Sequence, residues 1–205
     1  PSVEAFSQEF TKNGAYNNAS TGEYTMSYYA DCAILEWDRI LDLQRQAISE
    51  PVFTQKLLTS EKGNVSEELS GYASRHGRVL AQSLHKAMGD ALTLDIDQLA
   101  TVPQVSLDNI IAHHKGTHTL RNMRFTFAGD LKKHREAIVS QLESWQLPVG
   151  ERLAVPAVTV HSTQPVYLFR QELPSIIFAL HIALNRKLTE QEETAMGAVN
   201  HILTG

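Results

Sequence analysis

The sequence predicts an α+β fold, a two-layer arrangement in which helices pack on one face of an antiparallel-rich mixed sheet. Three observations lead to this fold class. Hydrophobic residues make up 42% of the 205 residues and charged residues 20%, which is enough apolar side chain to form a core. Stretches with helical and with strand periodicity follow one another along the chain. The turns between them are short and carry glycine, asparagine or proline, as mixed helix and strand proteins require.

The first quarter of the chain predicts a helix, a hairpin and a second helix. A helix is predicted within residues 1–12, because their apolar residues have helical spacing. Residues 15–30 are rich in Thr and Tyr and are broken by Gly22, which predicts two strands around a turn. A stripe of apolar residues predicts a helix over 34–49, and Pro51 ends it.

The middle of the chain predicts three more helices and one strand. Residues 60–88 predict a long helix with Ser60 as its N-cap. A shorter helix is predicted over 106–115. Alternating residues over 123–128 predict a strand, and residues 131–145 predict an amphipathic helix.

The C-terminal part predicts an irregular linker, two strands and a final helix. Residues 147–163 hold two prolines, Pro148 and Pro156, which favours a linker or a strand of irregular course. Strands are predicted over 166–170 and 176–184. Thr189 and Glu192 have the spacing of a capping box at the start of the last helix.

Composition excludes several classes of protein. With 18 basic and 23 acidic residues, the net charge of −5 disfavours a broad nucleic-acid-binding face, so no nucleic-acid partner is expected. The single Cys32 excludes an internal disulfide framework and is expected to be a small buried residue. No apolar run approaches the roughly 20 residues that span a bilayer. We therefore expect a soluble protein, with the cytoplasm as the favoured compartment.

Two glutamates are candidates for metal or acid–base chemistry. Glu61 and Glu68 lie seven residues apart in a predicted helix, so they share one face of it. Such a pair can be a metal ligand with its supporting partner, or a general acid and base. The alternative is a solvated acidic face, with Glu67 beside them.

The chain also holds a His-rich motif, formed by His113, His114 and His118. The i, i+4 pair can hold zinc on a helix. Gly116 lies between its two members, however, and indicates that the helix ends there. The alternative is a helix C-terminus whose histidines cap carbonyl groups.

Four stretches of the chain form a pattern when they are taken in order. They are residues 10–29 with Gly14, Asn18-Ala19 and Thr21; residues 50–69 with Glu61 and Glu68; residues 114–130 with Asn122-Met123 and Gly129-Asp130; and residues 176–205. Together they resemble the insulinase/pitrilysin family of metallopeptidases, which have an inverted zinc motif. The resemblance covers nearly the whole chain.

The resemblance implies a set of site residues. In this family two histidines and a catalytic glutamate come from an HxxEH motif, and a later glutamate completes the zinc site. It implies that Glu68 is this third zinc ligand and Glu61 its supporting carboxylate. It also implies that Asn18, Ala19 and Ser20 bind substrate as an edge strand, consistent with their small and polar side chains.

No HxxEH motif occurs in these 205 residues. We expect that the chain starts just after the motif and is a fragment of a zinc-dependent metalloendopeptidase, inert by itself. Zinc is then expected in the complete parent and not in this chain. The alternative is a non-catalytic family homologue that acts as a subunit or scaffold.

The resemblance also implies a division of the chain and a set of partners. Residues 1–150 are expected to form the family's first domain without its opening strands and motif helix. Residues 151–205 are expected to be a linker and the β-β-α start of the second domain. The expected partners are a peptide or unfolded protein substrate, the remainder of the parent or a second family subunit, and a second copy of the chain in a homodimer.

Overall fold

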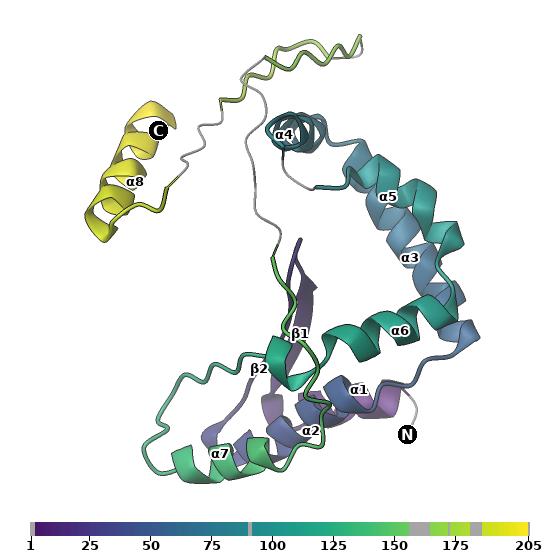
Figure 1. The fold of residues 1–205 in the computed structure, drawn as a ribbon, viewed down its shortest axis with the longest axis vertical. Helices are drawn as coiled ribbons and strands as arrows, with labels where there is room; N and C mark the ends of the chain where they lie inside the picture. Colours follow the sequence, from purple (N-terminus) through teal and green to yellow (C-terminus); the bar gives the residue numbers. More distant parts are fainter. Residues whose placement is uncertain (1–2, 90–91, 156–164, 172, 181–185, 205) are drawn as a thin grey trace. The chain divides into compact units, whose positions relative to one another are not determined.

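The structure is a computed structural model that describes residues 3–89, 92–155, 165–171, 173–180 and 186–204. It confirms the α+β class: the described residues form many helices and one two-stranded antiparallel sheet. The chain divides into two compact units, one of Pro1–Ser74 with Leu92–Ala157 and the other of Arg75–Ala91 with Val158–Gly205. Figure 1 shows the helices and strands of both units. Among the described helices, none is both long and apolar enough to cross a membrane.

The first unit contains the hairpin and most of the helices. Its elements are, in chain order, α1 (Val3–Thr11), η1 (Lys12–Gly14), β1 (Tyr16–Thr21), β2 (Met26–Asp31), η2 (Ile34–Glu36), α2 (Trp37–Ser49), α3 (Gln55–Ala73), α5 (Asp95–Thr101), η3 (Val102–Gln104), α6 (Leu107–Thr117), η4 (Leu120–Asn122) and α7 (Arg135–Glu143). Helix α1 ends where the sequence predicts, because Asn13 and Gly14 both adopt positive φ values, 61° and 78°.

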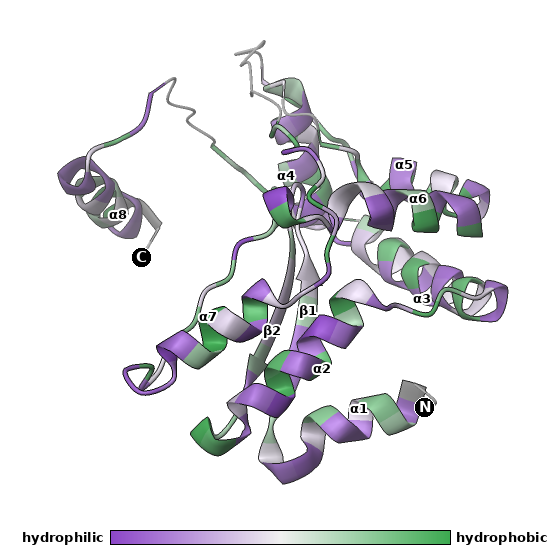
Figure 2. Cartoon of the chain, turned by 60° about the horizontal axis from the view of Figure 1, so that its bottom comes forward, coloured by the Kyte–Doolittle hydropathy of each residue, from purple (hydrophilic) through white to green (hydrophobic). Residues whose placement is uncertain are grey.

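The core of this unit is built around α2. Ile40 and Leu43 belong to a first cluster of buried residues that also contains Phe10 and Ala15. Leu41 and Ile48 belong to a second cluster, which they share with Ile138 of α7 and with Trp145. Helix α2 is therefore covered by apolar side chains on two sides. Its apolar residues alternate with polar ones along the helix in Figure 2.

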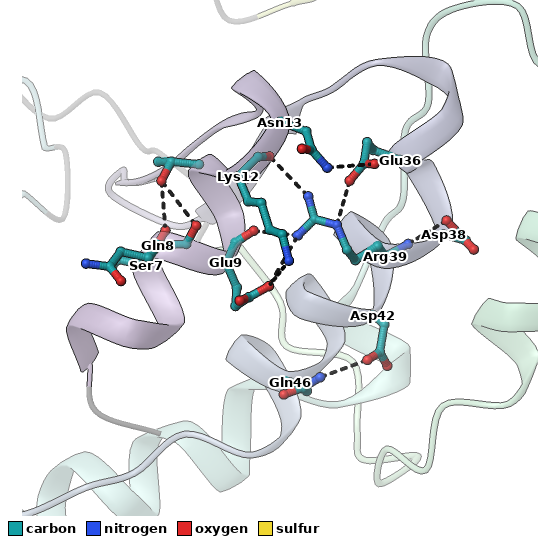
Figure 3. A network of polar contacts seen from close by, with 11 residues as sticks. Ser7, Gln8, Glu9, Lys12, Asn13, Glu36, Asp38, Arg39, Asp42 and Gln46 are labelled. Atoms are coloured by element: carbon teal, nitrogen blue, oxygen red, sulfur yellow. Dashed lines mark hydrogen bonds and ion pairs between the residues drawn. The ribbon is translucent and has the colours of Figure 1, made fainter.

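A network of polar contacts fixes α1 against the start of α2 (Figure 3). Arg39 Nε donates to Glu36 Oε2 over 2.6 Å, and the same guanidinium donates to the carbonyl oxygens of Glu9 and Lys12. Asn13 Nδ2 donates to the other carboxylate oxygen of Glu36 over 3.0 Å. These bonds hold the pKa of Glu36 below its usual range, through Arg39 first and then Asn13.

Helix α3 begins earlier than the sequence predicts. Its N-cap is Thr54, whose Oγ1 accepts from the Leu57 N–H over 3.2 Å, so Ser60 lies inside the helix. Helix α5, which the sequence analysis did not predict, contacts α3, and Lys62 Nζ donates to the Pro103 carbonyl over 2.9 Å. Leu69 is the one buried residue described on α3.

A close contact joins the end of α6 to the segment after α7. The Leu120 N–H donates to the Pro148 carbonyl and the Arg121 N–H to the Val149 carbonyl, over 2.9 and 3.1 Å. Gly150 has a φ of +62°, and a Cβ placed there would lie 2.3 Å from Thr119 Oγ1. Only glycine fits this position without a shift of its surroundings.

The predicted strand over 123–128 is not formed. Phe125 packs edge-on against Trp145, with ring centroids 5.3 Å apart, yet the described part of the chain supplies no strand beside this segment. A strand needs the backbone groups of a partner, and alternation of side chains by itself does not provide one.

Cys32 differs from the sequence-based expectation as well: it was expected to be buried, and it is exposed.

The second unit contains α4 (His76–Ala87) and α8 (Glu190–Thr204). The sequence predicted α3 and α4 as one helix, but the backbone becomes extended at Arg75. Ser74 Oγ bonds to the Gly71 carbonyl over 2.7 Å and ends α3. The capping box of α8 is confirmed, since Thr189 Oγ1 accepts from the Glu192 N–H and the Glu192 carboxylate accepts from the Thr189 N–H.

The two strands predicted in the second unit differ from the structure. Residues 166–170 and the described part of 176–184, residues 176–180, form no ladder. Their large apolar side chains are exposed, with Ile176 at 96% and Tyr167 at 87%. Residues 181–184 of the second predicted strand lie outside the described residues.

Candidate functional site

The structure places both candidate glutamates on one helix, α3, and leaves both exposed. They are two turns apart, which is about 10 Å along the helix axis. Glu68 Oε1 accepts from the Tyr72 hydroxyl over 2.5 Å, and Glu61 Oε2 accepts from Asn64 Nδ2 over 3.2 Å. Each carboxylate is therefore oriented by a neighbour on its own helix.

These two glutamates do not form a zinc site by themselves. A hydrolytic zinc ion takes three protein ligands and keeps one open position. At this separation Glu61 and Glu68 cannot bind the same ion together. Within the described residues no group of three His, Cys, Asp or Glu side chains could hold a metal ion. The exposed carboxylate of Glu68 suits zinc as one ligand, and the other ligands are not found in the described part of this chain.

The three candidate substrate-binding residues lie in the middle of β1. The register pairs Asn18 with Tyr29, Ala19 with Tyr28, and Ser20 with Ser27. Because side chains alternate along a strand, Asn18 and Ser20 share one face of the hairpin and Ala19 lies on the other. Asn18 Nδ2 donates to the Tyr16 hydroxyl over 3.0 Å on its face.

The outer edge of β1 carries a backbone donor whose partner is a side chain. The Gly22 N–H donates to the Thr25 carbonyl over 2.7 Å at the turn. Residue pairs along an antiparallel ladder alternate between hydrogen-bonded and non-hydrogen-bonded pairs. Gly22 and Thr25 form a hydrogen-bonded pair, so Ala19 and Tyr28, three pairs further along the register, form a non-hydrogen-bonded pair. The Ala19 N–H therefore points away from β2, and Asn18 Oδ1 accepts it over 2.8 Å.

The His-rich motif is not arranged as a metal site. His114 Nε2 lies 2.9 Å from the Ile48 carbonyl, and His118 Nε2 lies 2.9 Å from the Tyr28 hydroxyl. The two rings stack with centroids 4.1 Å apart and an interplanar angle of 22°. His118 is the C-cap residue of α6, as the helix-end interpretation predicts, and its N–H donates to the His114 carbonyl.

A pocket of about 440 Å³ lies beside these two histidines. Phe53, Ile111 and Leu147 line it with apolar surface, and Lys115 and Glu50 line it with charge. Phe53 also packs edge-on against His114, with ring centroids 5.3 Å apart. Another pocket lies over α7, and none of the candidate residues lines it.

Sequence reasoning missed three residues that contact the candidate groups. Tyr72 follows Glu68 by four residues, a spacing at which helical side chains meet. That spacing could have identified it. Tyr28 and Phe53 reach the histidines from distant parts of the chain, with Tyr28 90 residues from His118. No local pattern could have found those two contacts.

Comparison with known proteins identifies the first half of the chain. Residues 1–101 match the model of the family described as Insulinase, peptidase family M16. The match includes the hairpin, α2 and α3, so it covers Asn18–Ser20 and both candidate glutamates. No curated protein sequence matches the chain. From its first 101 residues, the chain belongs to the insulinase family of peptidases.

Proposed function

We propose that this chain is part of a zinc-dependent metalloendopeptidase that hydrolyses peptides. The observation that carries the proposal is the family match over residues 1–101, which spans both groups of candidate residues. The complete parent would supply the two histidines and the glutamate of an HxxEH motif. The 205 residues lack that motif and are proposed to be inactive alone.

In this proposal Glu68 is the zinc ligand that the present chain contributes. Its carboxylate is exposed, and the Tyr72 hydroxyl holds one oxygen and leaves the other for a metal. Glu61 lies on the same helix face, two turns earlier, and would support the site through other ligands. Zinc, when bound in the parent, would polarise the scissile carbonyl and activate water.

The peptide would bind along the outer edge of β1 by strand addition. Within the described residues β1 pairs only with β2, so its outer backbone groups can meet an extended chain. The Ala19 N–H points to that side. A peptide carbonyl would replace Asn18 Oδ1 as its acceptor. Main-chain bonds of this kind give affinity with little preference for sequence.

Exchange of Glu68 in the complete parent tests the zinc assignment. Glu68→Gln should lower zinc occupancy and peptidase turnover together, because one of three ligands loses its charge. Glu67→Gln, on the neighbouring exposed residue, is the matched control and should leave both unchanged. Zinc content by atomic absorption and turnover of a quenched peptide measure the two effects. Equal zinc content in both variants and the wild type would refute the role of Glu68.

A second experiment tests strand addition. Ala19→Pro removes the outward N–H and leaves the bonds between β1 and β2 in place. In the parent, KM should rise about tenfold, because one peptide hydrogen bond worth about 1.4 kcal/mol is lost. Ala19→Ser keeps the N–H and is the control. An unchanged KM for Ala19→Pro, with normal circular dichroism, would contradict peptide binding at this edge.

A non-catalytic subunit is the alternative outcome of these experiments. It would be supported if the residues encoded upstream of Pro1 contain no HxxEH and the parent shows no chelator-sensitive turnover. Turnover by the isolated 205-residue chain that a chelator abolishes would contradict both proposals. In that case His113, His114 and His118 would become the candidate zinc ligands.

A further inference from the structure

The hairpin is joined to α6 by a contact between Tyr28 and His118. The Tyr28 hydroxyl lies 2.9 Å from His118 Nε2, and the two rings meet edge to face with centroids 5.9 Å apart. His118 in turn stacks on His114, which is anchored to the Ile48 carbonyl at the end of α2. A chain of contacts thus runs from β2 through two imidazole rings to α2.

The hydrogen bonds around His118 define which nitrogen carries its proton. The Thr117 hydroxyl donates its one proton to the His113 carbonyl over 2.8 Å. The same oxygen lies 2.9 Å from His118 Nδ1 and can only accept there. In the neutral ring Nδ1 therefore carries the hydrogen, and Nε2 accepts from the Tyr28 hydroxyl.

The surroundings of His118 disfavour a positive charge. Helix α6 presents His113, His114 and Lys115 near it, and β2 presents the neutral Tyr28 phenol. Glu50 lines the same pocket, but its carboxylate is bonded to Arg45 Nη1 over 2.5 Å. Burial is the largest cause that lowers the pKa of His118, and electrostatic interaction with His114 and, less strongly, with His113 lowers it further, whereas the hydrogen bond to the His114 backbone raises it.

We propose that neutral His118 positions the hairpin against α6 through Tyr28, and that protonation of His118 in mild acid releases it. Protonation turns Nε2 into a donor. Tyr28 must then rotate its own proton away, onto the weaker acceptor Met26 Sδ at 2.8 Å. The new cation also faces the stacked ring of His114 at 4.1 Å, where a second charge would repel it.

The direction of the pH effect follows from the lowered pKa. The positioned state, in which His118 holds the hairpin through Tyr28, favours the neutral ring. The stabilisation of this state by His118 is therefore complete above the ordinary histidine pKa of about 6.5. It is lost as the pH falls through the lower pKa of His118 in the positioned state. Acid thus frees the hairpin, and neutral pH holds it.

Amide hydrogen exchange of residues 16–31 in the 205-residue chain tests the proposal. Protection factors, corrected for intrinsic exchange, are compared near pH 7.5 and near pH 5. We expect the wild-type hairpin to lose about tenfold in protection for each pKa unit by which the two states of His118 differ. His118→Gln keeps an acceptor near the Nε2 position and cannot be protonated, so its protection should not change with pH. His113→Gln leaves the Tyr28–His118 contact in place, so it is the control and should keep a pH response.

Several results would overturn the proposal. These are equal wild-type protection at both pH values, a pH response retained by His118→Gln, or a response abolished by His113→Gln. If His118→Gln does not fold, nitrogen-15 chemical shifts of the wild-type His118 ring decide. A neutral ring with its hydrogen on Nε2, or a ring that protonates above the ordinary pKa, would refute the mechanism.

The consequence for peptide binding rests on the proposed function. Tyr28 is the register partner of Ala19, so release of β2 would also move the outer edge of β1. In the parent, KM should then rise in mild acid in the wild type and not in His118→Gln. If exchange responds to pH as expected and KM does not, the positioning role stands and strand addition at β1 is wrong.

Discussion

Helices α2 and α3 belong to the same unit and lie within the same family match, but they differ in how many of their residues are buried. Four of the thirteen residues of α2 are buried, and they reach two separate clusters. Helix α3 is longer, with nineteen residues, yet only Leu69 is buried on it. Helix α2 therefore organises the core, whereas α3 keeps most of its surface in contact with solvent.

Because α3 is mostly exposed, residues on it can serve function without contributing to the core. Substitutions of the four buried residues of α2 disturb packing, so their effects on function cannot be separated from folding. The exposed face of α3 carries Glu61 and Glu68, and exposed polar residues on a helix can change without loss of the fold.

Truncation of an apolar side chain should show the difference between α2 and α3 most clearly. Leu41→Ala on α2 should lower the free energy of unfolding by about 2 to 5 kcal/mol, because it leaves a cavity in the second cluster. Leu57→Ala on α3, where the side chain is 42% exposed, should change it by about 0.5 kcal/mol or less. Urea unfolding measures both. Equal effects would show that α3 is packed as α2 is.

The polar network of Arg39 should produce the next largest effect. Arg39→Met removes bonds from a charged group to the carbonyls of Glu9 and Lys12, and should destabilise by about 1.5 to 3 kcal/mol. Arg45→Met, which loses ion pairs with Asp42 and Glu50, should cost about 1 kcal/mol or less. A larger loss for Arg45→Met would contradict the assigned role of Arg39.

The same network predicts a dependence on pH. The pKa of Glu36 is lowered in the fold, so its contribution is present above the unfolded pKa of about 4.3. The contribution is lost as the pH falls through the lower pKa of the folded state. In Arg39→Met the pKa of Glu36 should return towards its ordinary value. Carbon-13 detection of the Glu36 carboxyl group follows both titrations.

The smallest effect is expected on α3 and has the opposite sign. Apart from its chain neighbours and the surrounding backbone of α3 itself, no described atom lies within 4 Å of a Cβ built at Gly63. Gly63→Ala should therefore stabilise the chain by about 0.5 to 1 kcal/mol, since alanine is the better helix former. Gly150→Ala is the contrasting control and should destabilise, because its Cβ would overlap Thr119. A destabilising Gly63→Ala would mean that this face of α3 is covered.

The sequence predicted those elements whose signals are local. Asn13-Gly14 ends α1, and Ser106 caps α6 through Oγ, which accepts from the Asn109 N–H over 3.1 Å. The hairpin was predicted from its Thr and Tyr content and the break at Gly22, and α2 from periodicity, and both are confirmed. Each of these depends on residues within a few positions of one another, so the chain's own pattern contains the information.

The remaining elements depend on partners that no local pattern reveals. Residues 123–128 have the alternation of a strand but lack a neighbouring strand among the described residues. The break at Arg75 divides a continuous helical pattern, and the acidic first turn of α5, Asp95 and Asp97, was a signal that went unused. For the site, spacing placed Glu61 and Glu68 on one helix. Spacing along the sequence could not identify the contacts that Tyr28 and Phe53 make with the histidines.

The two-sided burial of α2 also has a kinetic consequence. On one side, Arg39 bonds to a carbonyl 30 residues away; on the other, Gln141 Nε2 bonds to the Asp38 carbonyl across 103 residues. Closing the longer loop costs about 1 kcal/mol more in chain entropy. The first cluster should therefore assemble in the folding transition state, and the second should dock afterwards. During synthesis, the α1–hairpin–α2 assembly can form while α7 is still inside the ribosome, which makes α2 the template on which the rest of the unit condenses.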